Sequence, residues 1–432
     1  MILIYLNKHT ARSQFVFEFI FKEQFGIVFK ITNDTQEFEN STDTKINYST
    51  QRLHSGLFLY NTGLLEDDSL RKVPVTIGEV QGVKVLFPSE ACDLGFDLFA
   101  ATFYMLSRYE EYLPFTEDKY GRFTAEDSLS FKNGFLEIPI IDAGIDLLAK
   151  GLNFPANFSK FQAILTYDID VAYKFRGRNF ERNLGSTVKD LLKLDFKNFF
   201  LRSMVALKLK KDPWDIYDEL KENLSKNNLE SIFFFLLGEN SEYDRNLDYN
   251  SPAMIDLIKE ISQFSEIGIH PSFASNKSKI KVAAEKQRLE FIANKKVRKS
   301  RQHYLKLQFP KTYFKLIEAG ITEDYSMAFP DRVGFRAGTC KPFYFYDLKN
   351  EATTNLRIFP ITCMEVTFMN YEKLTPEKAL MKILSLMQTV KHYRGTFISI
   401  WHNENLSLSG RSMVWKNVHE QMIRQIKSYL KK

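Results

Sequence analysis

The chain has 432 residues, 44% of them hydrophobic and 26% charged, with a formal net charge of +6 at pH 7. This length exceeds one small domain, so we expect two globular domains with substantial cores, and the composition excludes long disorder. The net charge is only mildly positive and is smaller than that of a typical nucleic-acid-binding protein. We therefore expect no nucleic-acid partner. Basic residues gather at 176–211 and 277–301. We interpret them as solvated helix faces, with attraction to an anionic glycan, a lipid-linked sugar or a membrane surface as the alternative.

Cysteine usage and the first residues indicate a cytoplasmic protein. The three cysteines, Cys92, Cys340 and Cys363, are too few and too far apart for a disulfide framework or a Cys-rich zinc site. Residues 1–8 predict a β-strand and lack the basic start, long apolar region and cleavage site of a signal peptide. No apolar stretch reaches the roughly 18 residues that a membrane span needs. We therefore expect a cytoplasmic location and no membrane span.

Residues 1–155 are predicted to form a separate N-terminal α/β domain. Its first expected elements are a strand at 2–6, a helix at 11–24, and strands near 27–32 and 83–87. The strongest helical pattern spans 95–112, where several Phe residues share an apolar face, and Pro114 ends it. We interpret the charged cluster at 108–111 as local ion pairs and the segment 120–123 as a turn. This half predicts no chemistry of its own.

From residue 156 to 432, apolar strands alternate with helices, which predicts a parallel sheet, open or closed into a barrel. We expect strands at 161–165, 232–237, 267–269, 333–336, 358–364 and 396–401, and helices at 280–298, 312–319, 376–392 and 415–430. Residues 179–228 interrupt this alternation. They are interpreted as a basic helical insertion between the first two strands.

Two carboxylates, Asp168 and Asp170, directly follow the first apolar strand. Asp is a poor strand former, so a pair at a strand end needs a reason. A turn or a helix N-cap would account for one Asp. An Asp-x-Asp pair is better explained by one carboxylate that binds a metal ion and another that acts as a base.

Nearly every predicted strand of this half ends in a residue that can bind a metal ion or move a proton. These residues are Asp168, Asp170, His270, His303, Arg336, Glu365 and His402. Because the carboxyl ends of barrel strands meet at one mouth, we expect these side chains to converge there. A lone His after a strand is usually a structural group, but three of them beside an Asp pair favour metal-assisted hydrolysis of an amide or ester.

Four segments, in this order, resemble the motifs of the polysaccharide deacetylases, the NodB-homology carbohydrate esterases. They are Thr166-Tyr-Asp-Ile-Asp170, Gly268-Ile-His-Pro-Ser272, Gly334-Phe-Arg-Ala-Gly338 and Ile398-Ser-Ile-Trp-His402. The resemblance covers about 160–430. It implies a distorted (β/α)7–8 barrel that removes N- or O-acetyl groups from a carbohydrate, such as a glycan or a lipid-linked precursor. The segments 107–112 and 120–123 resemble a domain that precedes such barrels in proteins of the Bacteroidetes type.

The resemblance also implies a role for each matching residue: Asp168 as the base, Arg336 as its orienting partner, His402 as the acid, and Asp170 and His270 as ligands of one divalent metal, expected to be zinc. We further expect Glu365 and Trp401 to bind substrate at the mouth.

One position departs from the family pattern. The second motif normally carries another His four residues after His270, where this chain has Ala274. We hypothesise that His303, after the next strand, supplies the third ligand, because the neutral oxygens of Ser275 and Asn276 suit zinc poorly. The alternatives are a metal-independent amidohydrolase of the same fold and a catalytically inactive barrel that binds glycan.

Overall fold

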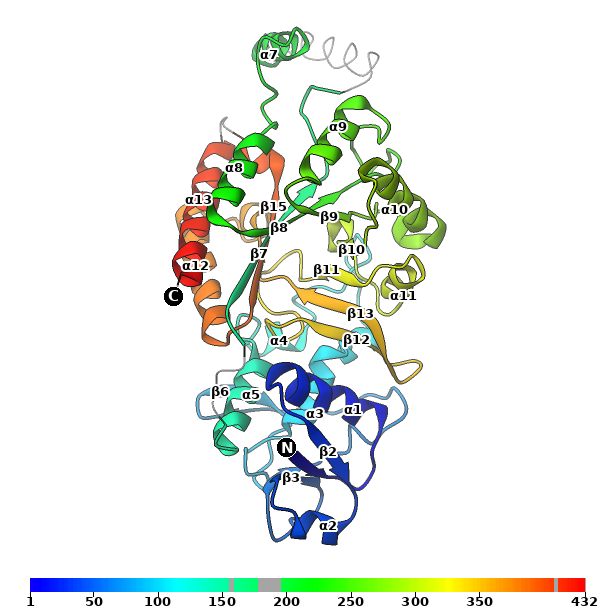
Figure 1. Cartoon of the computed structure of the whole chain (residues 1–432), viewed down its shortest axis with the longest axis vertical. Coiled ribbons are helices and arrows are strands. Elements are labelled where there is room, and N and C mark those ends of the chain that lie inside the picture. The colour runs from blue at the N-terminus through cyan, green and yellow to red at the C-terminus, as the bar shows by residue number, and fades with distance from the viewer. Residues whose placement is uncertain (155–158, 178–195, 408–410, 432) are drawn as a thin grey trace.

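The computed structural model describes residues 1–154, 159–177, 196–407 and 411–431. Figure 1 shows a small N-terminal domain beneath a larger unit built on a curled sheet. Of the predicted basic insertion at 179–228, residues 179–195 lie outside the described residues, and the remainder contains helices α7 (Phe196–Ala206) and α8 (Tyr217–Asn227). Within the described ranges, no helix is long and apolar enough to cross a membrane.

The N-terminal domain is a four-stranded parallel sheet with helices and a hairpin. The strand order is β2 (Phe29–Thr32), β1 (Ile2–Tyr5), β3 (Thr44–Ser49), β4 (Leu57–Tyr60). The hairpin pairs β5 (Ile77–Val80) with β6 (Val83–Leu86), and the helices are α1 (Ala11–Phe17), α2 (Thr35–Asn40), α3 (Leu98–Leu106), α4 (Leu129–Lys132) and α5 (Ile140–Gly151). The predicted helix at 95–112 is divided, because Arg108 adopts a left-handed φ of 54° after α3.

The larger unit holds nine strands in the order β12-β13-β11-β10-β9-β8-β7-β15-β14, and all neighbours are parallel except β12 with β13. The strands are β7 (Gln162–Ile169), β8 (Glu230–Phe235), β9 (Glu266–Ile269), β10 (Lys299–Ser300), β11 (Glu323–Met327), β12 (Phe343–Asp347), β13 (Ala352–Pro360), β14 (Cys363–Met364) and β15 (Thr396–His402). The sheet curls into a half-barrel (Figure 1). Its interior is filled by an apolar cluster that includes Ile164, Phe234, Tyr325 and Ile398.

The segment Ile361–Thr362 connects two strands that lie far apart in the strand order, β11 and β15. β13 pairs with β11, and the chain continues until Ile361 N–H donates to Met327 O at 3.0 Å and Thr362 N–H donates to Ile398 O at 2.8 Å. β14 then pairs with β15. The carboxyl ends of β7, β9, β10, β11 and β15 are therefore gathered around one opening.

One predicted strand is corrected, and one observed strand was not predicted. Residues 333–336, predicted as a strand, form a loop in which Gly334 has φ 134° and approaches the N-terminal domain so closely that a Cβ would lie 2.4 Å from Leu136 O. The strand at this place in the fold is β11 (Glu323–Met327), whose polar sequence gives no apolar run.

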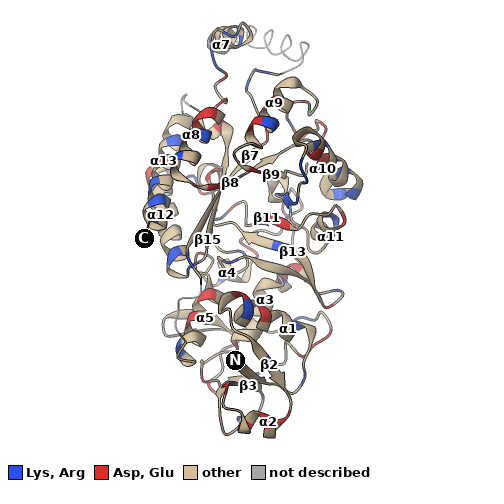
Figure 2. Cartoon of the chain, viewed as in Figure 1, with Lys and Arg blue, Asp and Glu red and all other residues tan. Residues whose placement is uncertain are grey.

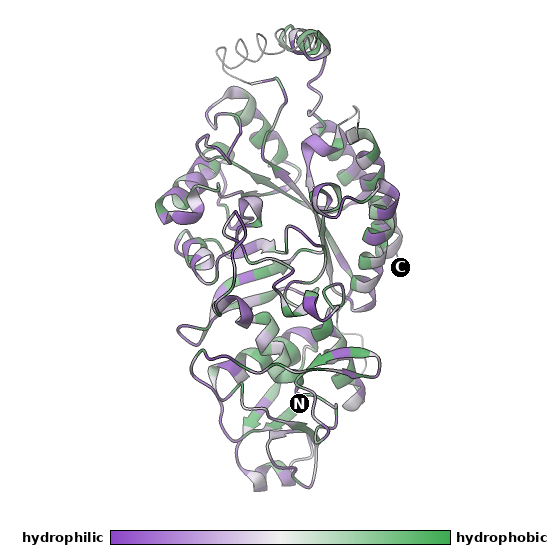
Figure 3. Cartoon of the chain, turned by 180° about the vertical axis from the view of Figure 1, so that it is seen from behind, coloured by the Kyte–Doolittle hydropathy of each residue, from purple (hydrophilic) through white to green (hydrophobic). Residues whose placement is uncertain are grey.

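Helices cover the outside of the sheet: α8, α9 (Pro252–Ile261), α10 (Lys279–Ala293), α11 (Lys311–Glu318), α12 (Pro376–His392) and α13 (Arg411–Leu430). Two of them begin with a side-chain N-cap followed by proline, Ser251-Pro252 and Thr375-Pro376, the arrangement that best satisfies the first helical N–H groups. Charges of both signs lie on these helices (Figure 2), and each helix mixes hydrophobic and hydrophilic residues (Figure 3). The basic run at 277–301 is accordingly paired with acids, as in Lys286 with Glu290.

The N-terminal domain and the half-barrel share one hydrophobic core. Tyr346 of β12 packs on Phe15 and Phe103, with ring centroids 5.0 and 5.1 Å apart. Beside this contact, Glu111 bridges Arg108 and Arg336, and all three side chains are buried. The charged cluster after α3 therefore forms ion pairs, one of which crosses to the barrel.

Candidate metal centre and active site

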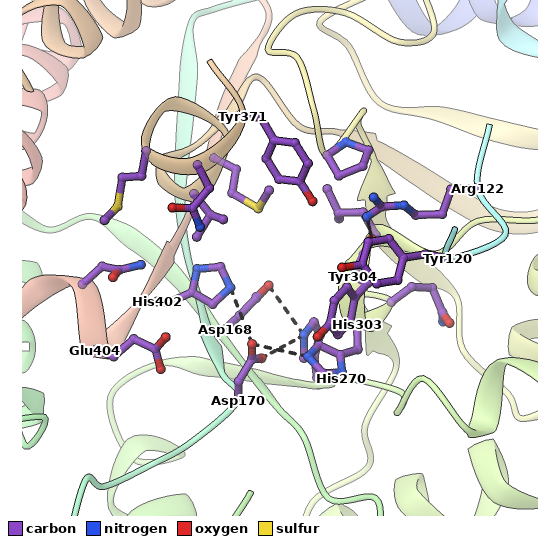
Figure 4. Close-up of a pocket in the computed structure, with 18 residues that line it drawn as sticks. Tyr120, Arg122, Asp168, Asp170, His270, His303, Tyr304, Tyr371, His402 and Glu404 are labelled. Carbon is purple, nitrogen blue, oxygen red and sulfur yellow. Dashed lines mark hydrogen bonds and ion pairs between the residues drawn. The ribbon is translucent and has the colours of Figure 1, made fainter. Parts of the chain in front are cut away.

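A cavity of about 430 Å³ opens at the carboxyl ends of the parallel strands. Strand periodicity decides which side chains reach it, because alternate residues face opposite sides of a sheet. In β7, Ile164 lies in the interior cluster whereas Leu165, Tyr167 and Ile169 lie in the outer core. The same alternation turns Asp168 and Asp170 toward the opening, where both line the cavity (Figure 4).

Asp170, His270 and His303 form a compact cluster whose possible ligand atoms all lie within 4.8 Å of one another. The Nε2 atom of His270 lies 3.2 Å from Oδ1 of Asp170, and Nε2 of His303 lies 3.4 Å from Oδ2. The structure thus brings the predicted replacement ligand, His303, next to the other two. Oδ1 of Asp170 is buried and accepts no hydrogen bond from the described residues.

The partners of the two imidazoles define their tautomers. Nδ1 of His270 lies 2.6 Å from the carbonyl oxygen of Arg301, and Nδ1 of His303 lies 2.9 Å from Oδ1 of Asp244. Because those oxygens only accept, Nδ1 carries the proton in each ring. In the neutral rings, both Nε2 lone pairs are then aimed at a carboxylate, which favours a cation or a proton between them.

The carboxylate behind His303 is one that sequence reasoning missed. Asp244 is fully buried in the loop after β8 and accepts the N–H groups of Phe273 at 2.7 Å and Ala274 at 3.2 Å. Ala274 therefore helps, through its backbone N–H, to hold the partner of His303. No strand end or motif marks Asp244 in the sequence.

The charges of this cluster shift its pKa values strongly. Burial acts to raise the pKa of Asp170, but the His303 and His270 imidazoles outweigh it and lower the pKa well below its usual range. Burial acts to lower the pKa of His303, but Asp170 and Asp244 raise it to about 9. Without a metal ion, a proton on His303 balances the carboxylates, and a bound ion would have to displace that proton.

Asp168 is held by an arginine other than the expected one. Nη1 of Arg301 donates to Oδ1 of Asp168 at 2.8 Å, while Oδ2 lies 3.8 Å from Nε2 of His270. Arg336, predicted to orient the base, is instead buried against Glu111 and donates to Ala328 O at 2.8 Å. Arg301, which directly follows the two-residue strand β10, thus makes the contact with Asp168 that was expected of Arg336.

His402 faces the cluster from the last strand. Its Nδ1 lies 2.7 Å from Oε1 of Glu365, and its Nε2 lies 3.8 Å from Oδ2 of Asp170. Burial acts to lower the pKa of His402, but Glu365 raises it well above its usual range. Glu365 is buried, accepts the side-chain amide of Asn405 and the backbone N–H of His402, and does not line the cavity, so the expected contact with substrate is corrected to a contact with His402. Glu404 also lines the cavity, and burial raises its pKa to about 7.

Trp401 does not reach the mouth. It lies one residue out of phase with Ile400 and His402, so its ring faces the outer helices and packs against His419 with centroids 4.9 Å apart. The expectation that Trp401 binds substrate is thereby corrected, and period-two alternation within β15 is the physical reason.

Aromatic side chains form the upper walls of the cavity. Tyr120 and Tyr304 lie on one side, with ring centroids 5.1 Å apart, and Tyr371 lies across the opening (Figure 4). Tyr120 and its neighbour Arg122 come from the N-terminal domain, in the segment predicted only as a turn. Two successive residues after His303, Tyr304 (φ 61°) and Leu305 (φ 50°), are left-handed, a conformation that costs non-glycine residues about 1–3 kcal/mol each.

Comparisons with known proteins give the following. A family model described as a family of unknown function, DUF7033, matches residues 2–155. No curated protein matches the chain. Among solved structures, one from Mycobacterium smegmatis described as a polysaccharide deacetylase is 13% identical, with a TM-score of 0.40, covering 61% of this chain and 84% of that one.

Two further structures show a similar level of likeness. A CE4 family pseudoenzyme from Bacillus anthracis is 13% identical, with a TM-score of 0.33, over 64% of this chain and 63% of that one. A polysaccharide deacetylase from Bacillus cereus is 13% identical, with a TM-score of 0.30, over 62% and 87%. All three TM-scores lie below 0.5, so the function proposed next rests on the geometry of the site.

Proposed function

We propose that this protein is a metal-dependent hydrolase that removes N- or O-acetyl groups from a carbohydrate. The observation that carries the proposal is the convergence of two imidazole Nε2 atoms on the carboxylate of Asp170, whose side chain is 24% exposed. A bound cation would take the place of the proton that His303 otherwise holds and would interact with all three groups at once.

The donor set fits zinc. Two imidazole nitrogens and one carboxylate oxygen are ligands that catalytic zinc commonly takes, with one position open. In a tetrahedral site with bond lengths of about 2.0–2.1 Å, ligand atoms lie about 3.3–3.4 Å apart. In this structure the two nitrogens approach different oxygens of Asp170, with Nε2 of His270 3.2 Å from Oδ1 and Nε2 of His303 3.4 Å from Oδ2, and the candidate ligand atoms all lie within 4.8 Å of one another. When bound, the ion would polarise the acyl carbonyl and lower the pKa of a water molecule.

The other residues supply proton transfer. Asp168, ion-paired with Arg301 beside the cluster, accepts the proton of the attacking water. His402, protonated because Glu365 raises its pKa, donates a proton to the departing nitrogen or oxygen of the sugar. The products are a free amine or hydroxyl and acetate.

The walls of the cavity support a sugar substrate. Tyr304 is partly exposed and Tyr371 is 38% exposed, and both line the opening above the carboxylates. Aromatic rings with an apolar face and a polar tip suit the faces and hydroxyls of a pyranose. A glycan or a lipid-linked precursor is the proposed substrate class.

Acetate release from N-acetylated and O-acetylated oligosaccharides tests the function. We expect turnover that a chelator abolishes and added Zn²⁺ restores, and a loss of 10²-fold or more in His402→Ala. Turnover that persists with chelator would favour the metal-independent amidohydrolase, and binding of the oligosaccharide without any turnover would favour the inactive glycan-binding barrel. Full activity in His402→Ala would remove the proposed acid.

A further inference from the structure

The loop that carries the replacement ligand is short and conformationally demanding. Arg301, which pairs with Asp168, and His303 lie two residues apart, directly after β10. The two residues that follow, Tyr304 and Leu305, are both left-handed. Non-glycine residues hold that conformation only where the surrounding structure requires it. Some contact must therefore fix the backbone immediately after His303.

That contact comes from the N-terminal domain. Nη1 of Arg122 donates to the carbonyl oxygen of Tyr304 at 2.7 Å, and the Tyr120 ring lies against the Tyr304 ring. The neighbouring Gln308 donates from Nε2 to Gly121 O at 3.2 Å. Three successive residues of one turn thus contact the segment that follows the ligand.

The turn itself is rigid. Asp118 Oδ1 accepts the N–H groups of Tyr120 at 2.9 Å and Arg122 at 3.0 Å, and its Oδ2 accepts Nε of Arg122 at 2.9 Å. Gly121 has φ +76°, and a Cβ there would meet Gln308 at 3.3 Å. The Arg122 guanidinium is 4% exposed, so it reaches Tyr304 from a fixed, largely dehydrated position.

We propose that the turn at residues 118–122 belongs to the active site, with Arg122 as a positioning residue for His303. The inference rests on the proposed function, since it concerns the proposed metal centre. Asp244 orients the His303 ring from one side, and Arg122 holds the backbone that follows it from the other. The N-terminal domain is thereby assigned a role, which is to complete a metal centre whose third ligand lies on a strained loop.

Metal affinity tests this inference without the use of a substrate. Zn²⁺ binding is measured by competition with a chromophoric chelator, and Co²⁺ is used as a spectroscopic probe of the ligand geometry. We expect Arg122→Ala to weaken Zn²⁺ binding by about tenfold or more and to alter the Co²⁺ spectrum. Arg122→Lys keeps one hydrogen-bond donor but lacks the planar guanidinium group, so we expect a smaller loss of Zn²⁺ affinity.

The matched control is Arg332→Ala. Arg332 also joins the barrel to the N-terminal domain, through Glu126 at 3.1 Å, but lines no part of the cavity. It should leave Zn²⁺ affinity unchanged. The double variant Arg122→Ala/His303→Ala should bind no more weakly than His303→Ala, because the two residues act through one ligand. If Arg122→Ala does not fold, Asp118→Asn, which loosens the turn, replaces it with the same expected direction.

Wild-type affinity in folded Arg122→Ala, or an equal loss in Arg332→Ala, would overturn the inference and leave the proposed function standing. Absence of Zn²⁺ binding in the wild-type protein would instead overturn the metal-dependent function itself, and the positioning role with it.

Discussion

At the scale of single residues, the two carboxylates of the Asp-x-Asp pair have different surroundings. Asp170 faces two imidazoles, whereas Asp168 is paired with Arg301. We expect Asp170→Asn to lower Zn²⁺ affinity by more than 100-fold, because it removes the charged ligand. Asp168→Asn should keep affinity within about tenfold while turnover falls 10²–10⁴-fold, since it removes the base. Metal titration and acetate release on the same samples check this, and equal loss of affinity in both variants would contradict the division of roles.

The Glu365–His402 pair predicts a pH dependence. Glu365 raises the pKa of His402, so the imidazole remains protonated at neutral pH and loses its proton only in alkaline solution. The rate should therefore fall on the alkaline side as His402 deprotonates. In Glu365→Gln that fall should move to lower pH, because the charge that favours the imidazolium is gone. The profile of kcat against pH measures the shift, and an unmoved alkaline limb would exclude His402 as the acid.

Most residues of the site could be predicted from the sequence, and the misses have physical reasons. Strand ends marked Asp168, Asp170, His270, His303 and His402, because parallel strands present their carboxyl ends together. Trp401 was misplaced although the alternation of β15 already turns it away from His402. The orienting arginine was placed at 336 because Gly334–Gly338 resembles the arginine motif of the deacetylases. Arg301 was missed because the strand before it, β10, has two residues and shows no apolar run.

At the scale of elements, helix α10 anchors the loop after β9. Its Glu285 accepts the N–H of Ser272 at 2.9 Å and the Ser272 hydroxyl at 2.6 Å, two residues beyond His270. Burial raises the pKa of Glu285 from 4.5 to about 7. The folded state therefore binds a proton between about pH 7 and 4.5 where the unfolded state does not, and this group adds stability as the pH falls through that range.

Glu285→Gln should remove this contribution. We expect the wild-type free energy of unfolding to rise from pH 8 to pH 5 more steeply than that of the variant, by about 1–3 kcal/mol over the range. Urea unfolding of both proteins at several pH values measures the difference. Parallel pH profiles would show that Glu285 titrates normally in the folded protein.

The elements themselves were predicted unevenly. Long apolar runs such as β8 and strongly periodic helices such as α12 and α13 were placed near their observed bounds. β11 was missed because its residues Glu323–Met327 alternate without an apolar run, while the apolar 333–336 became a loop in contact with Leu136. In both cases contacts with segments distant in the sequence determine the secondary structure. The local pattern of apolar residues does not show such contacts.

At the scale of the whole molecule, the buried cluster of Glu111, Arg108 and Arg336 joins the N-terminal domain to the half-barrel. Burial acts to raise the pKa of Glu111, but the two guanidinium groups lower it, so the carboxylate stays charged. Glu111→Ala would leave two buried guanidinium groups without this partner. We expect a loss of about 3–5 kcal/mol in the free energy of unfolding.

Glu126→Ala is the matched control for that loss. Glu126 pairs with Arg332 across the same pair of domains, but the Glu126 side chain is 65% exposed and that of Arg332 31% exposed, and ion pairs in contact with solvent contribute about 1 kcal/mol or less. Urea unfolding compares the two variants with the wild-type protein. Losses of equal size would mean that the buried cluster contributes no more than an exposed ion pair.

We propose that the protein holds a catalytic metal ion through His303, with Asp170 and His270 as the other ligands. The decisive measurement is elemental analysis of the purified protein beside a His303→Ala variant. We expect about one equivalent of zinc or a similar divalent ion in the wild-type protein and its loss from the variant. No metal in either protein, even after incubation with excess ions, would contradict the proposal, and metal retained by the variant would show that the third ligand is not His303.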